Sequence, residues 1–304
     1  MDENTIQAVV FGNANLDLLC YPVNDVPRYD AISFEQASLG PGGCGSNVAI
    51  GLRALGVSTA LVARTGVDEA AELVERYWSQ VGLDTSYVIK SPGYPTGISV
   101  GLVDDEGEPR FIHMPGANAL LTAADIELPA LVSAGARWLH VAGFFVLPGL
   151  KDGSLPETLM KAQEAGLSVS LDVVDSPGMD DPSILWPCLP YVDILLCNAQ
   201  EARRLTGEKE PARSGRFLQE RGAISVIVKV GGEGCWLFGQ QTAELLPATP
   251  VRPFDTTGAG DAFAAGLIAA LLDGDDIRQA CIKASASGRR MVNALGAVSG
   301  WRTA

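Results

Sequence analysis

Short apolar runs that alternate with amphipathic stretches constrain the fold of this chain more than any other feature. The runs that favour strands lie at 8–11, 59–63, 138–141, 168–171, 193–197 and 225–230. The stretches that favour helices lie at 47–55, 69–81, 123–133, 156–165, 199–206, 212–221, 258–272 and 276–293. Nearly continuous apolar strands alternating with helices are typical of a parallel sheet covered on both faces. The sequence therefore predicts an α/β fold.

Two stretches interrupt this alternation, one at about 16–39 and one at about 86–114. Both contain short strands and turns without helical periodicity, so we expect one small β-sheet that projects from the α/β body as a lid. A chain of 304 residues with 47% hydrophobic and 19% charged residues can bury one large core. We therefore expect a single domain, 1–304, that carries the lid.

Composition narrows the functional classes. The formal net charge of -14 disfavours nucleic acid and anionic membranes, so neither is expected as a partner. The N-terminus lacks the features of a signal peptide, and no apolar run reaches the roughly 18 residues of a membrane span. No cysteine lies in a CxxC pair, and neither histidine lies in a zinc or Ser-His-Asp motif; His140, in an apolar run, is expected in the core. We expect a soluble, cytoplasmic protein with reduced cysteines.

The segment DTTGAGD at 255–261 carries the strongest chemical signal, because it leads directly into an apolar helix. A glycine-rich turn there exposes backbone N–H groups at the positive end of the helix dipole, which makes an anion site. The carboxylate of Asp261, in the first turn of that helix, could accept a proton from an attacking alcohol. It could equally be a helix cap, and the pattern alone leaves both readings open.

Other polar segments also allow two readings. GPGGCGSN at 40–47 contains GxGxxG but follows no buried first strand, so its backbone and Asn47 could instead contact a polyhydroxylated ligand. Asn198 and Glu201 follow a strand, where they would cap a helix or lie near magnesium. The glycines within 229–234 could close around a nucleotide or form a hairpin turn. No GxxxxGK[ST] motif is present, which disfavours a P-loop ATPase.

Taken together, these residues resemble the PfkB, or ribokinase-like, family of carbohydrate kinases. One family signature fits 42–47 with Ala49, Gly56 and Gly66 at the expected spacings, and the other fits 255–268. Further residues fall in the family order, namely Asp17, 116–118, Asn198, Glu201 and 229–234. The resemblance covers nearly the whole chain, including both lid segments. It implies a three-layer α/β/α sandwich with a mostly parallel sheet and a small β-sheet lid.

The resemblance also implies an ATP-dependent kinase that phosphorylates a hydroxyl of a sugar or sugar-like molecule, with Mg²⁺ as cofactor and a homodimer formed through the lid. Asp261 is then the catalytic base. The implied anion hole consists of Gly258, Ala259 and Gly260. The implied sugar contacts are Asp17, Gly42, Gly43 and Asn47. The implied nucleotide and magnesium residues are Asn198, Glu201 (through water), Lys229, Gly231 and Gly234. Asp255 matches a ligand of the monovalent cation that many relatives bind, so K⁺ is a further candidate.

Two departures from the family pattern leave the acceptor open. Cys44 replaces the lysine of typical ribokinases, and 143–145 replaces a sugar-binding carboxylate. Phe144 or Phe145 could face an apolar group such as a nucleobase, or pack in the core. Arg110 and His113 could reach the acceptor from the lid, or be solvent-exposed. The alternatives are a nucleoside kinase, a non-catalytic ligand-binding protein, and a dehydrogenase based on the GxGxxG match.

Overall fold

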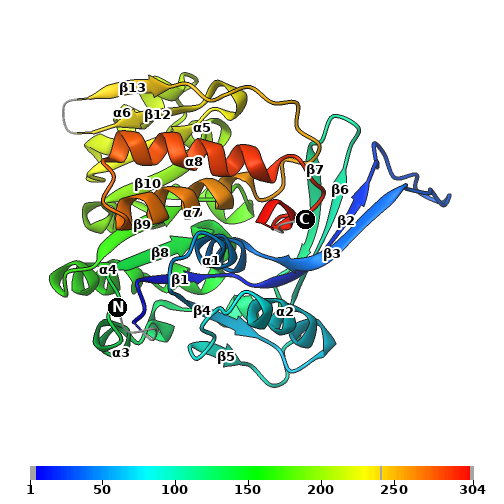
Figure 1. The fold of residues 1–304 in the computed structure, drawn as a ribbon, viewed down its shortest axis with the longest axis horizontal. Coiled ribbons are helices and arrows are strands. Elements are labelled where there is room, and N and C mark those ends of the chain that lie inside the picture. The colour runs from blue at the N-terminus through cyan, green and yellow to red at the C-terminus, as the bar shows by residue number, and fades with distance from the viewer. Residues whose placement is uncertain (1–4, 240–241, 302–304) are drawn as a thin grey trace.

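A computed structural model describes residues 5–239 and 242–301, and its strands form two sheets (Figure 1). The nine-stranded sheet has the order β13-β12-β11-β10-β9-β8-β1-β4-β5. Its strands are β1 (Ala8–Gly12), β4 (Thr59–Thr65), β5 (Val88–Lys90), β8 (Trp138–Ala142), β9 (Ser168–Asp172), β10 (Ile194–Asn198), β11 (Ser225–Lys229), β12 (Cys235–Phe238) and β13 (Ala243–Leu246). Only the pairings of β12, with β11 and with β13, are antiparallel. The predicted parallel sheet is confirmed.

Helices cover both faces of this sheet. They are α1 (Cys44–Ala54), α2 (Glu69–Gln80), α3 (Leu128–Ser133), α4 (Leu155–Glu164), α5 (Ala199–Thr206), α6 (Pro211–Glu220), α7 (Ala259–Leu272) and α8 (Ile277–Met291). Alternate strand residues point to opposite faces, so each strand contributes side chains to two hydrophobic cores. Phe11 and Leu171 pack with α3 to α6, whereas Val10 and Leu196 pack with α1, α2, α7 and α8. These two cores confirm the three-layer sandwich.

The smaller sheet projects from one end of the body (Figure 1). It has the order β3-β2-β6-β7, and its strands are β2 (Asn15–Tyr21), β3 (Gln36–Gly42), β6 (Gly97–Val103) and β7 (Pro109–Met114). The predicted second lid segment, 86–114, is wrong at its beginning. Val88–Lys90 pairs with β4 and extends the large sheet, because this segment continues directly from α2 back to the sheet edge.

The predicted helix at 123–133 is divided in two. A short 3₁₀ turn, Ala123–Asp125, is closed by a capping box between Thr122 and Asp125, and α3 begins only at Leu128. Pro129 explains the break, because proline has no N–H to donate and restricts the residue before it. Among the described residues, no helix has the length and apolarity needed to cross a membrane.

The lid joins the body where β1 ends and β2 begins. The buried side chain of Asn118 fixes this junction, accepting a hydrogen bond from Ala14 N (2.9 Å) and donating to Ala14 O (3.0 Å). It also donates to Asn15 Oδ1 (2.9 Å) at the start of β2. The carboxyl ends of β1, β9, β10 and β11 share one edge of the large sheet, so this junction brings the lid to the edge where open α/β folds bind ligands.

Candidate active site

The turn before α7 has a backbone that requires glycine. Gly258 has φ of +76°, in the left-handed region, and a Cβ there would lie 2.2 Å from Ala297 O. The helix begins at Ala259, whose own N–H donates to Thr256 O (3.2 Å), and no side chain caps the first N–H groups. Unpaired N–H groups at a helix N-terminus attract anions. The predicted anion turn therefore has suitable geometry, while its contact with phosphate stays a prediction.

Asp255 ties this turn to the C-terminal segment. Its buried carboxylate accepts hydrogen bonds from Thr257 N and Gly296 N, both at 2.8 Å. The bond from Gly296 N is not predictable from the sequence pattern, because Gly296 lies 41 positions further on. The turn is thus held from two sides before any ligand binds.

Asp261 lies in the first turn of α7 and faces α1. Asn47 Nδ2 donates to Asp261 Oδ2 at 2.8 Å, which joins two residues 214 positions apart. Burial raises the pKa of Asp261 to about 7, with Asp172 adding to the rise and Asn47, Lys229 and Cys44 opposing it. A carboxyl group that titrates near neutrality is suited to taking a proton from an alcohol.

Asp17 lies on β2, on the lid side of the same site. Burial raises its pKa to about 7; a hydrogen bond from Ser99 lowers it and the charge of Asp261 raises it further. A Cβ on Gly42 would lie 1.9 Å from Asp17 Cγ, so glycine leaves the room that this carboxylate occupies. Gly43, with φ of +83°, likewise sits against Asn13 O. The structure therefore gathers Asp17, Gly42, Asn47 and Asp261.

A residue that the sequence analysis did not single out lies beside Lys229. Asp172 ends β9, and its buried carboxylate pairs with the Lys229 ammonium at the end of β11, 3.2 Å away. A carboxylate directly after an apolar strand was the available signal, since Asn198 was found in that way. Its partner lies 57 positions away, so the pair itself was not visible in the sequence.

Asn198 and Glu201 form a reciprocal cap at the start of α5. Asn198 Oδ1 accepts from Glu201 N (2.8 Å), and Glu201 Oε2 accepts from Asn198 N (2.6 Å). Glu201 Oε1 also accepts from Asp175 N (3.4 Å). Burial raises the pKa of Glu201 to about 7, with Lys229 opposing the rise. The capping reading is confirmed, and a role near magnesium stays a prediction.

The predicted nucleotide glycines lie in the hairpin between β11 and β12. Gly231 and Gly234 have φ of +60° and +114°, and a Cβ on Gly234 would lie 2.0 Å from Leu246 O. The hairpin reading is therefore confirmed, and nucleotide contact stays a prediction. Gly40 and Gly42 lie in lid strand β3 rather than after the first strand of the large sheet, so the dinucleotide reading of GxGxxG is wrong.

Four ambiguous side chains are now resolved. His140 is buried beside Ser170, with Nδ1 2.8 Å from Oγ, and burial lowers its pKa to about 3. Phe144 and Phe145 pack edge to face inside the core. Arg110 donates to the carbonyl oxygens of a lid loop (residues 23 and 24). The core readings of these three aromatic positions are confirmed, and Arg110 is occupied within the lid.

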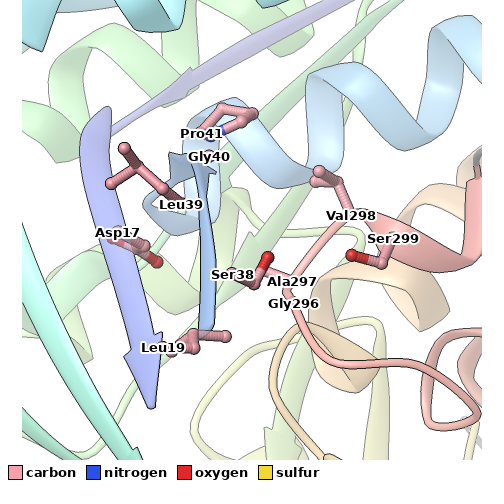
Figure 2. A pocket seen from close by; sticks show the side chains of 10 residues that line it. All are labelled: Asp17, Leu19, Ser38, Leu39, Gly40, Pro41, Gly296, Ala297, Val298 and Ser299. Carbon is pink, nitrogen blue, oxygen red and sulfur yellow. The ribbon is translucent and has the colours of Figure 1, made fainter. Parts of the chain in front are cut away.

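Two hollows border the site. One lies where lid strands meet the C-terminal segment, and Figure 2 shows Ser38 of β3 opposite Gly296 and Ala297, with Asp17 on the neighbouring strand. The other, of about 330 Å³, lies between α8 and the segment that leads to Asp255. Its lining residues are Pro250, Val251, Ala286, Arg289, Arg290 and Asn293.

Phosphoryl transfer to an alcohol needs a base and an anion-binding turn within reach of each other. At the edge of the large sheet, the carboxylate of Asp261 follows directly after the glycine turn that begins α7. The class that these features define is a small-molecule phosphotransferase. The profile of the pfkB family of carbohydrate kinases matches residues 5–304, and the chain belongs to this family.

Individual relatives agree with this placement. A 2-dehydro-3-deoxygluconokinase of Bacillus subtilis is 30% identical over 98% of this chain and 93% of its own length. A fructokinase of Vibrio alginolyticus is 29% identical over 76% of each chain. The structure of an Arabidopsis thaliana ribokinase complexed with ribose and ATP has a TM-score of 0.81 at 28% identity, covering 97% of this chain and 95% of that one. The predicted ATP-dependent sugar kinase, with an alcohol group as acceptor, is confirmed; the individual sugar is not fixed by these relatives.

Proposed function

We propose that this single kinase domain transfers the γ-phosphate of ATP to a hydroxyl of a neutral, polyhydroxylated acceptor, with Asp261 as the catalytic base. The observation that carries the proposal is the 2.8 Å hydrogen bond between Asn47 and Asp261. This bond joins Asp261 in the first turn of α7 to α1, the helix that follows Gly42 and Gly43. A sugar is the first candidate for the acceptor, and a nucleoside is the alternative.

Two orphaned oxygens support a neutral acceptor. Asp17 Oδ1 and Asn47 Oδ1 are buried and lack hydrogen-bond partners among the described residues. A buried acceptor without a donor is costly, so both atoms favour a ligand that brings O–H groups. A sugar acid or sugar phosphate would instead bring its charge near the carboxylates of Asp17 and Asp261. Electrostatic repulsion disfavours such an acceptor.

The residues then divide the reaction as follows. Asp17, Asn47 and the bare backbone at Gly42 and Gly43 orient the acceptor. Asp261 takes the hydroxyl proton as the acceptor oxygen forms a bond to the γ-phosphorus. The bond from that phosphorus to the β,γ-bridging oxygen breaks, and ADP leaves with the electron pair. The N–H groups at 258–260 stabilise the charge on the transferring group.

ATP needs a divalent cation, and Mg²⁺ would neutralise part of its phosphate charge. Both carboxylate oxygens of Glu201 already accept backbone N–H groups, so contact through water suits Glu201 better than direct coordination. Among the described residues, no group of three or more acidic, histidine or cysteine side chains could hold a metal alone. Asn198, Glu201, Lys229, Gly231 and Gly234 are the residues we assign to the nucleotide and its cation.

A monovalent cation such as K⁺ also fits the chain. Asp255 is fully buried, and no ion pair to it occurs within the described part of the chain. The hydroxyl of Thr257, two residues on, is buried without a partner. A buried carboxylate is normally paired or coordinates a cation. Turnover that is unchanged when tetramethylammonium replaces K⁺ would contradict this assignment.

A coupled assay of ADP release tests the proposed function. The neutral probes are D-fructose, D-ribose and adenosine, and the matched anionic probes are 2-dehydro-3-deoxygluconate and fructose 6-phosphate. We expect acceptor-dependent turnover with at least one neutral probe, and kcat/KM at least tenfold lower with either anionic probe. Preference for an anionic probe would refute the neutral acceptor. Binding without turnover for every probe would favour a non-catalytic ligand-binding protein.

We further propose a homodimer formed through the lid and a cytoplasmic location. Leu39 (56%) and Ile112 (67%) are exposed apolar side chains on one face of the lid, in register with Leu18 and Val100 between them. Clustered exposed apolar residues are typical of protein interfaces. All six cysteines are free thiols, which suits a reducing compartment.

A further inference from the structure

A buried ion pair joins Lys229, which is assigned above to the nucleotide, to Asp172, which has no role in the reaction described so far. Lys229 Nζ lies 3.2 Å from Asp172 Oδ2 and 3.3 Å from Oδ1, and the two side chains are only 15% and 4% exposed. Removing two charges from water costs about as much as their attraction returns, so a buried pair contributes little net stability. A functional explanation is therefore needed.

The lysine of this pair lies against the anion turn. A Cβ on Gly260 would be 3.1 Å from Lys229 Nζ, so the ammonium lies beside the backbone whose N–H groups are assigned above to the transferring phosphate. Glycine at position 260 leaves the space that this approach requires. Asp172 and Lys229 end strands on either side of β10, so the carboxylate reaches the ammonium from the far side of that strand.

The charges around Lys229 keep it protonated. Burial alone would lower its pKa, but Asp172, Glu201 and Asp261 together raise it above its ordinary value. Phosphoryl transfer collects negative charge at the transferring group, and amide N–H groups offer only partial positive charges. A fixed ammonium beside the turn supplies the full charge that the turn lacks.

We propose that Asp172 is a positioning residue, which holds the Lys229 ammonium beside the 258–260 turn so that it can meet the terminal phosphate of ATP. The proposal rests on the proposed kinase function and adds an unassigned residue to it. This role accounts for three observations. Glycine at position 260 leaves room for the ammonium, Asp172 pairs with it from a nearby strand end, and three carboxylates keep it protonated.

The pair also acts on the catalytic base, with opposite signs. Asp172 on β9 raises the pKa of Asp261, whereas Lys229 on β11 lowers it. The other groups that face Asp261 are Asn47 and Cys44 on α1, which lower its pKa, and Asp17 on β2, which shares a repulsion with it. Neutralising the two members separately should therefore move the pKa of Asp261 in opposite directions, whereas neutralising a pair remote from the site should not move it.

The first variant is Asp172→Asn, which keeps the shape and removes the charge. We expect kcat to fall about tenfold or more with the best acceptor of the panel above, with a small change in the acceptor KM. We expect the acid limb of kcat/KM to move to lower pH, because a negative neighbour of Asp261 is lost. Asp172→Glu should recover part of kcat.

The second variant is Lys229→Met, which removes the positive charge. We expect a larger loss of kcat, weaker calorimetric binding of the Mg²⁺ complex of a non-hydrolysable ATP analogue, and an acid limb at higher pH. Lys229→Arg should restore part of the analogue affinity. The binding measurement needs no acceptor, so it separates this proposal from the identity of the sugar.

The matched control is Asp125→Asn, which breaks the ion pair with Arg64 at 2.6 Å, whose side chains are 9% and 22% exposed. That pair lies outside the site, so Asp125→Asn should lower the melting temperature and leave the pH profile unchanged. Acid limbs that move together, or do not move, in Asp172→Asn and Lys229→Met would overturn the proposal. Failure of the proposed function itself would look different, because the unmodified protein would then show no turnover.

Discussion

The catalytic edge of the large sheet and the lid are built on different principles. At the edge, charged groups are held by specific polar partners, as Asp255 is by Thr257 N and Gly296 N and Asp261 is by Asn47 Nδ2. On the lid, apolar side chains such as Ile112 and Phe111 are exposed, while the loops are held by ordinary hydrogen bonds. We infer that the edge carries the chemistry common to the family, and that the lid carries acceptor choice and association.

Asp261 gives the strongest test of the contrast between the edge of the large sheet and the lid. Asp261→Asn should lower kcat about 10³-fold, because the amide cannot take the hydroxyl proton, while binding of the ATP analogue persists. Asp273→Asn is the matched control, since Asp273 is exposed at the opposite end of the same helix. Steady-state kinetics and calorimetry measure both effects. Near-normal turnover in Asp261→Asn would mean that the edge of the large sheet does not supply the catalytic base.

The pH profile sharpens the same contrast. Asp261 must be ionised to accept a proton, and its pKa is about 7 in the folded protein. We therefore expect kcat/KM to rise with pH through neutrality and then to level off, with a loss of about tenfold per pH unit well below that point. Asp17, with a pKa also about 7, would steepen the slope if its charge is needed too. A profile that is flat between pH 5 and 7 would contradict this prediction.

Replacing a glycine tests whether the turn before α7 depends on its positive φ and on the space beside it. Gly258→Ala should cost about 1–3 kcal/mol of unfolding free energy from its positive φ alone. The added Cβ would lie only 2.2 Å from Ala297 O, and this clash should add to the cost. By displacing the N–H groups of the turn, it should also lower kcat about tenfold or more. Gly274→Ala is the control, because φ there is +98° but nothing lies within 4 Å of the added methyl group. Equal effects of both substitutions in urea unfolding and kinetics would argue against a built turn.

The smallest effect is expected on the lid. Ile112→Ser should weaken self-association in analytical ultracentrifugation, and raise the acceptor KM a few-fold while kcat and unfolding free energy change little. Val67→Ser is matched in exposure, 70% against 67%, but lies outside the lid and should change none of these quantities. A large fall in kcat for Ile112→Ser would mean that the lid contributes to chemistry as well.

The sequence was sufficient wherever the structure follows from continuous local patterns. The apolar runs predicted six of the seven strands that make parallel pairings to within a few residues, because strands buried on both faces are continuous apolar runs. Val88–Lys90 was misplaced because a three-residue strand carries too little pattern to tell one sheet from another.

The sequence predicted the glycine turn and the start of α7, because the residue type at position 258 matches the backbone conformation that the turn requires. Asp172 was missed because a lone carboxylate after a strand is ambiguous until its partner is known, and Lys229 meets it only through the tertiary fold. The bond from Gly296 N to Asp255 is of the same kind, and so is the contact of Asn47 with Asp261.

The 214-residue separation between Asn47 and Asp261 has a consequence for synthesis. A ribosome releases the first strand, the lid and α1 long before it releases α7, which must then pack against α1. A growing or truncated chain that ends before α7 contains the described strands of the large sheet, yet it lacks Asp261 and the helix that presents it. In the proposed mechanism, such an incomplete chain cannot transfer phosphate from ATP until α7 has been synthesised and has packed against α1.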